Sequence, residues 1–148
     1  MKYNSNGDTY KGQYLSGLRS GFGELSTIKG EGYIGEWLND VKHGRGRYVF
    51  ENGDLYEGDF KGGMADGKGK FTKASIGSVY EGDFRANQQN GKGKEIFGDG
   101  AVYEGDFMSD RKSGNGIFLF ADGSRYTGSF LNDEIHGRGK HKSSKNKV

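Results

Sequence analysis

A tyrosine recurs along this chain of 148 residues at intervals of 23, 23, 24, 23 and 23 residues. A glycine follows each of these tyrosines by two positions, a second aromatic residue by four, and a Gly-x-Gly by eleven. A fixed period of this length is typical of arrays in which each unit buries its apolar face against its neighbours. The repeats start at Tyr10, Tyr33, Tyr56, Tyr80, Tyr103 and Tyr126.

The full spacing, Tyr-x-Gly-x4-Gly-x3-Gly-x-Gly, is complete at 10–23 and again at 56–69. It resembles the MORN (membrane occupation and recognition nexus) repeat, present in six copies in register. We therefore divide the chain into a repeat array over residues 1–140 and a basic, flexible tail over residues 141–148. Within the array, residues 1–9 read as a half repeat, and full repeats start at 10, 33, 56, 80, 103 and 126.

In four repeats the second glycine of this pattern is replaced by aspartate or asparagine. These are the residues other than glycine that best tolerate left-handed backbone, so the position is predicted to be a turn residue with positive φ. The four residues are Asp40, Asn87, Asp110 and Asp133.

Alternation with a period of two places the tyrosine, the glycine and the second aromatic residue on one face of a short strand. In the following strand Gly44, Gly46, Tyr48 and Phe50 likewise share a face. Asn-Gly and Asp-Gly pairs are strong hairpin-turn signals, so successive strands are expected to be antiparallel neighbours. The predicted fold is all-β: a single-layer, twisted antiparallel β-meander of tandem hairpins, about twelve strands in all.

Composition favours a thin aromatic core. Only 31% of the residues are hydrophobic and 29 are glycine, but nine Tyr, ten Phe and one Trp supply large rings to bury. The sequence has no helical segment that could cover the aromatic face, so part of that face is expected to stay exposed. Exposed apolar patches usually mark interaction sites.

Charged residues alternate with the aromatic ones and are expected to face the opposite side. First strands carry acidic residues such as Glu57 and Asp59, and second strands carry basic residues such as Lys68 and Lys70. This arrangement predicts opposite charges across the ladder, so we interpret these carboxylates as structural and not as catalytic.

We expect no enzyme activity, no metal site, no cofactor and no small-molecule substrate. There is no cysteine, no serine or threonine lies in a recognisable triad context, and His43 and His136 would lie far apart along the array. A net charge of +2 gives no general attraction for nucleic acid. Because neither a signal-peptide pattern nor a bilayer-length apolar run is present, we expect a cytoplasmic location.

Three surfaces are candidates for partner binding. The first is a partner-binding groove along the aromatic row, the second is a set of apolar residues on the outward face, and the third is the basic tail. The groove residues are Tyr33, Trp37, Tyr56, Phe60, Tyr80, Phe84, Tyr103, Phe107, Tyr126 and Phe130. The outward apolar residues are Phe22, Val49, Ile117 and Leu119, and the tail residues are Lys142, Lys145 and Lys147.

The leading hypothesis is a scaffold that binds a segment of a protein partner, or a second copy of itself as a homodimer, on the aromatic row. The resemblance to MORN proteins implies cytoskeletal, ciliary or membrane-junction assemblies. The alternative is a peripheral module that binds phospholipid at a membrane surface, as the family's name suggests. A third reading is glycan binding by ring stacking, for which polar groups that would orient sugar hydroxyls are not evident.

Overall fold

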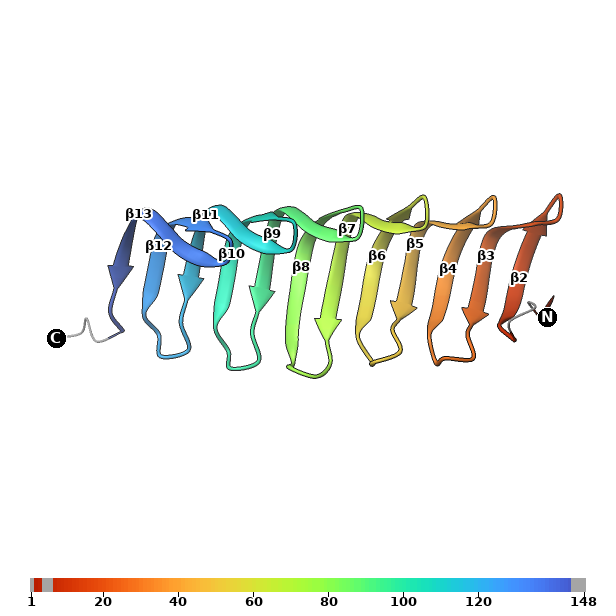
Figure 1. The fold of residues 1–148 in the computed structure, drawn as a ribbon, viewed down its shortest axis with the longest axis horizontal. Helices are drawn as coiled ribbons and strands as arrows, with labels where there is room; N and C mark the ends of the chain where they lie inside the picture. The colour runs from red at the N-terminus through yellow and green to blue at the C-terminus, as the bar shows by residue number, and fades with distance from the viewer. Residues whose placement is uncertain (1, 4–6, 145–148) are drawn as a thin grey trace.

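The computed structural model describes residues 2–3 and 7–144 and shows one antiparallel sheet in which each strand pairs with its sequence neighbours. The strands stand side by side along one long axis, with the two ends of the chain at opposite ends of the array (Figure 1). They are β1 (Lys2–Tyr3), β2 (Thr9–Leu15), β3 (Leu18–Ser26), β4 (Gly32–Leu38), β5 (Val41–Val49), β6 (Leu55–Lys61), β7 (Met64–Lys73), β8 (Ser78–Arg85), β9 (Gln88–Ile96), β10 (Val102–Met108), β11 (Arg111–Leu119), β12 (Arg125–Leu131) and β13 (Glu134–Lys142).

This architecture confirms the predicted single-layer meander. The half repeat predicted over residues 1–9 contributes the short β1, which pairs with β2 through Tyr3 and Thr9. The one additional residue of the third repeat lengthens β7 and β8, which have 10 and 8 residues, and Lys73 pairs with Ser78 at their lower end. Residues 2–3 and 7–144 contain no helix with the length and hydropathy needed to span a membrane.

Each repeat tyrosine lies flat over a pair of glycines, which explains why the glycines recur with it. The Tyr33 ring covers Gly35 and Gly46, which face each other across β4 and β5. A Cβ at Gly46 would lie 2.2 Å from Tyr33 Oη and 2.4 Å from its Cε1, so only glycine fits. The Tyr33 hydroxyl also donates a hydrogen bond of 2.8 Å to the Glu36 carbonyl oxygen.

A β-bulge follows the first glycine of each full repeat and bends the hairpin. In the second repeat the pairing shifts register between Gly35 and Trp37, and the Glu36 carboxylate accepts a hydrogen bond of 2.7 Å from the Arg45 backbone N–H. Bulges of this kind increase local twist and bend the strand. Figure 1 shows the result, because every hairpin curls over near its upper turn.

The aromatic rings pack edge to face in one continuous row. Tyr33 contacts Trp37 of its own repeat and Phe60 of the next repeat, with both centroid distances 5.1 Å. The same pair of contacts links each repeat to the next as far as Phe130. Edge-to-face geometry is the favoured arrangement for such pairs. A single sheet layer thus builds a core from its own side chains.

The turn residues confirm the predicted positive φ and have a second role. Asp40 has a φ of 72°, and its Oδ1 accepts a hydrogen bond of 2.8 Å from the Arg19 backbone N–H of the preceding repeat. We call this contact the turn clip. It recurs in the pairs Asn87 with Ala65, Asp110 with Gln89, and Asp133 with Lys112.

The last strand runs past the predicted end of the array. β13 ends at Lys142, so His141 and Lys142 pair with Tyr126 and Arg125 instead of beginning a tail. The boundary predicted at residue 140 therefore lies two residues short of the end of the strand, because the last repeat tyrosine keeps a strand partner as the other tyrosines do.

Candidate binding groove

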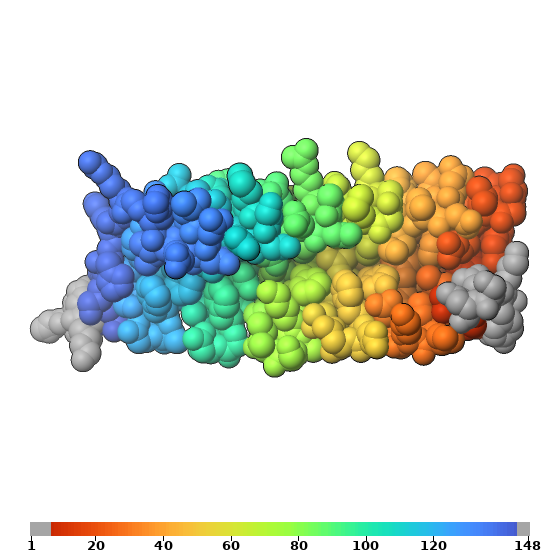
Figure 2. All heavy atoms as spheres, viewed as in Figure 1, coloured from red at the N-terminus to blue at the C-terminus, as the bar shows by residue number. Residues whose placement is uncertain are grey.

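A groove runs along the aromatic face beneath the bent hairpin tips, and half-buried rings from the second strands line it. Towards the N-terminal end, Tyr48 and Phe50 have centroids 4.8 Å apart, and Phe50 lies 5.7 Å from Phe71. We call these three residues the N-terminal aromatic cluster. In the space-filling view the upper tips and lower turns form two rows along the long axis, bordering this face (Figure 2).

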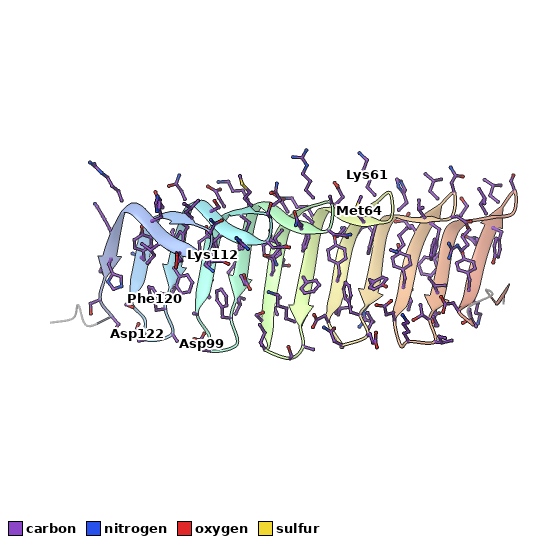
Figure 3. The ribbon with its side chains drawn as sticks, viewed as in Figure 1. Lys61, Met64, Asp99, Lys112, Phe120 and Asp122 are labelled. Atoms are coloured by element: carbon purple, nitrogen blue, oxygen red, sulfur yellow. The ribbon has the colours of Figure 1, made fainter. Side chains whose placement is uncertain are left out.

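The C-terminal aromatic cluster is the corresponding group further along the array, formed by Phe97, Phe118 and Phe120. Phe118 lies 5.7 Å from Phe97 and 4.6 Å from Phe120. Figure 3 shows Phe120 near the lower turns and Lys112 closer to the upper tips, so the groove between these borders has an aromatic and a cationic side.

The ten residues predicted to line the groove are its buried base. Their side chains range from 0% exposed at Tyr33 to 6% at Phe60 and Phe84. Burial makes this row the floor of the groove, where Tyr56, Phe60 and Phe84 line a hollow. The reason is that each tyrosine ring lies against glycine backbone while aromatic rings of its own and the next repeat close its edges. The two aromatic clusters, which are only partly buried, provide the accessible apolar area instead.

One hollow of the groove has a volume of about 460 Å³ and lies over the third repeat. The volume is in the range that accommodates a few side chains or a small ligand. It is lined by Lys42, Tyr48, Phe50, Tyr56, Phe60, Gly63, Ala65, Phe71, Phe84 and Asn87.

Two lysines project over aromatic rings in the groove. Lys42 Nζ lies 5.8 Å from the centroid of Tyr33 and 5.3 Å from that of Tyr48. Lys112 Nζ lies 5.3 Å from the centroid of Phe97 and also pairs with Asp133 at 3.3 Å. Burial lowers the pKa of Lys42, the positive charge of Arg19 lowers it further, and Glu31 acts in the opposite direction.

The tyrosines of this face are hydrogen-bond donors with strongly held protons. Burial raises the pKa of Tyr48 to about 12, and the hydrogen bond of its hydroxyl to Glu31 acts in the same direction. Burial also raises the pKa of Tyr103 to about 12, with a further contribution from Asp106. These hydroxyls are therefore neutral structural donors at physiological pH.

A buried carboxylate separates the two aromatic clusters. Glu95 of β9 takes the repeat position that Phe71 and Phe118 take in neighbouring repeats, and it is 7% exposed. Burial raises its pKa, while Lys73 and Lys112 lower it. Its ion pair with Lys73 is long, with 4.0 Å between Lys73 Nζ and Glu95 Oε2.

The opposite face carries the predicted ladder of charges. Arg45 pairs with Asp59 at 3.2 Å, and Lys68 and Lys92 pair with Asp83 and Asp106. Each pair joins the second strand of one repeat to the first strand of the next, which confirms the predicted pairing of opposite charges across the ladder.

The predicted outward apolar residues do not form one patch. Phe22 on β3 is separated from Ile117 and Leu119 on β11 by seven strands. Strand register instead joins Val49 and Leu119 to an apolar row that the sequence analysis missed. The row consists of Val49, Leu55, Val79, Ile96, Val102 and Leu119, interrupted by Thr72. The signal was present, because each member directly precedes or follows a buried or half-buried aromatic residue.

The remaining expectations concern the basic tail and metal binding. Lys142 is exposed on β13, while Lys145 and Lys147 lie outside the described residues. Within residues 2–3 and 7–144, no group of three or more His, Cys, Asp or Glu side chains could hold a metal ion.

Comparison with known proteins identifies the repeat. The MORN repeat model matches residues 10–30, 33–55, 56–75, 80–102, 103–125 and 126–147. No curated protein sequence matches the chain. Among solved structures, the fold is similar to that of the SAS-4 (dCPAP) TCP domain of Drosophila melanogaster, in complex with a proline-rich motif of Ana2 (dSTIL). The TM-score is 0.50 at 15% sequence identity, covering 72% of this chain and 57% of the other.

Proposed function

The chain belongs to the MORN repeat family, and from this premise we propose that it is a non-enzymatic interaction scaffold that binds a segment of another protein along its aromatic groove. The observation that carries the proposal is the pair of aromatic clusters, whose rings are half-buried and border an open hollow of about 460 Å³. Aromatic rings with partial exposure are the residues that most often anchor a bound protein segment.

The shape of the groove favours an extended or helical segment over a compact ligand. The clusters lie at the ends of β5 and β7 and of β9 and β11, on the strands or directly after them, so a partner that contacts both must run along the array. A likeness in fold to a domain captured with a proline-rich motif agrees with a peptide-like partner.

The test selects twelve-residue peptides from a random phage-displayed library on the intact protein and measures their affinities by fluorescence anisotropy. The groove variant is Phe50→Ser with Phe71→Ser, and the matched control is Leu119→Ser with Ile96→Ser on the opposite face. Circular dichroism checks that both remain folded. We expect the groove variant to lose affinity at least tenfold and the control to keep it, because only the first pair borders the hollow.

Two results would contradict the proposal. One is peptides whose affinity depends on Leu119 and Ile96 but not on Phe50 and Phe71, which would move binding to the outward row. The other is a stable dimer, measured by light scattering, that the groove variant converts to monomers. In that case a second copy of the chain is the occupant of the groove.

A further inference from the structure

The hairpin position directly below the upper turn carries a cation in three repeats. Arg19, Lys42 and Lys112 occupy it. In two of these cases the turn residue of the following repeat provides a carboxylate: Asp40 for Arg19 and Asp133 for Lys112. In the third case the turn residue is Gly63, which has no side chain.

The two completed cases share one geometry. Asp40 Oδ1 accepts from the Arg19 backbone N–H at 2.8 Å and from its Nε at 3.0 Å. Asp133 Oδ1 accepts from the Lys112 backbone N–H at 2.9 Å and from its Nζ at 3.3 Å. In both cases one carboxylate oxygen accepts two hydrogen bonds from the same residue of the preceding repeat, one from its backbone N–H and one from its charged side chain. The fold builds the same carboxylate site twice.

At Lys42 the same site is formed but lacks its carboxylate. The hairpins dock alike, because Gly63 N–H donates to the Lys42 carbonyl oxygen at 3.0 Å, as Asp40 N–H donates to that of Arg19 at 2.9 Å. A Cβ at Gly63 would have no atom within 4 Å, so the space for a side chain is open. Among the described residues no carboxylate lies within ion-pair distance of Lys42. Its Nζ lies over the rings of Tyr33 and Tyr48, and Glu31, which accepts from the Tyr48 hydroxyl, acts on its charge from further away.

This open site faces the groove. Lys42 and Gly63 both line the 460 Å³ hollow, together with Phe50 and Phe71 of the N-terminal aromatic cluster. An incoming carboxylate would find a half-buried cation, and apolar groups beside it would find aromatic rings. Charge-assisted hydrogen bonds are strong in partly desolvated sites of this kind.

We propose that Lys42 and Gly63 form a receptor site for an aspartate or glutamate side chain of the bound segment, flanked in that segment by apolar residues. The inference rests on the proposed function, since it names the chemistry of the partner that the groove takes. A side chain and not a chain terminus is the source, because side-chain carboxylates, those of Asp40 and Asp133, fill the two completed sites.

The test compares two seven-residue phage-displayed libraries that are random except for a central residue, fixed as Asp in one and Asn in the other. Three forms of the full chain are used: the natural sequence, Gly63→Asp and Gly17→Asp. Gly63→Asp places a carboxylate where Asp40 and Asp133 have theirs, with a φ of 84° that matches their conformation. Gly17→Asp is the matched control, a turn residue with a φ of 82° and equally open space, but with no full repeat before it.

We expect the Asp library to be enriched about tenfold over the Asn library on the natural chain and on Gly17→Asp. On Gly63→Asp the preference should disappear, because the new carboxylate occupies the site next to Lys42. Lys42→Met, which keeps the apolar stem, should also abolish the preference.

Equal enrichment of the two libraries on the natural chain would overturn the carboxylate site and leave the proposed function standing. A preference for Asp that persists on Gly63→Asp would likewise overturn it. If neither library yields clones that depend on Phe71, the proposed function fails together with this inference.

Discussion

Replacement of Gly46 by alanine tests the packing of tyrosine on glycine that underlies every repeat. The new Cβ would lie 2.2 to 2.5 Å from atoms of the Tyr33 ring, whereas non-bonded carbons normally sit about 3.5 to 4.0 Å apart. The ring must therefore retreat by about 1 Å. Tyr33 is 0% exposed, so it cannot move without breaking its contacts.

The expected cost follows from those contacts. Tyr33 would lose its hydrogen bond to Glu36, worth about 1 kcal/mol, and two edge-to-face pairs, worth about 0.5 to 1.5 kcal/mol each. We expect Gly46→Ala to reduce the free energy of unfolding by about 2 to 4 kcal/mol. Urea denaturation followed by circular dichroism and by Trp37 fluorescence measures it, since Trp37 is the only tryptophan and packs on Tyr33.

Gly32→Ala in the same hairpin is the matched control. Its Cβ would meet only the Leu25 carbonyl oxygen, at an ordinary 3.6 Å, so the change should be neutral or slightly stabilising. In a Tyr33→Ala background, Gly46→Ala should cost no more than Gly32→Ala, because the ring that it strikes is gone. Equal denaturation midpoints for Gly46→Ala and Gly32→Ala in the natural background would refute this account of the repeat glycines.

Other perturbations probe the charges and the turns. The hydrogen bond from the Lys68 side chain, and after it the one from the Lys92 backbone N–H, hold the pKa of Asp83 below its ordinary value. The ionised Asp83 carboxylate therefore stabilises the fold above pH 4, and this stabilisation is lost as the pH falls further. Asp83→Asn should reduce the fall in the free energy of unfolding at acid pH. Burial raises the pKa of Glu95, so its ionisation lowers the stability of the fold as the pH rises from the ordinary glutamate pKa to the raised one. Glu95→Gln should therefore raise the denaturation midpoint at pH 7 and leave it unchanged at pH 4. Asp110→Gly keeps the positive φ but removes the acceptor of the Gln89 N–H, and should cost about 1 kcal/mol in the same urea assay.

Much of the fold could be predicted because short-range sequence patterns determine it. The tyrosine period fixed the repeats, the alternation of Gly46, Tyr48 and Phe50 placed them on one face, and Asp40 revealed a positive φ. These inferences need only strand geometry and turn chemistry. Exposure could not be predicted in the same way, because whether Tyr33 or Tyr48 faces solvent depends on how closely the next hairpin approaches.

The bulge and the turn clip were missed for a related reason. Period-two alternation treats Glu36 as one more outward residue, whereas its carboxylate accepts from the Arg45 backbone N–H across the hairpin. The clip between Asp40 and Arg19 joins residues of different repeats, and no pattern within one repeat contains it. The site at Lys42 becomes visible only when repeats are compared in space, because the informative residue there is a glycine.

The turn clips can form only in the order in which the repeats are synthesised. The acceptor of each clip comes from the repeat that is synthesised later. The Arg19 backbone N–H has its acceptor only once Asp40 has been made, and the Lys112 backbone N–H only once Asp133 has been made. On a ribosome, where chains emerge from the N-terminus onward, each of the four clipped hairpins therefore exposes an open backbone donor until roughly one further repeat has been made. Four repeats are completed by their successors in this way, so a chain stalled just after one of them would present an unfinished hairpin at its growing end.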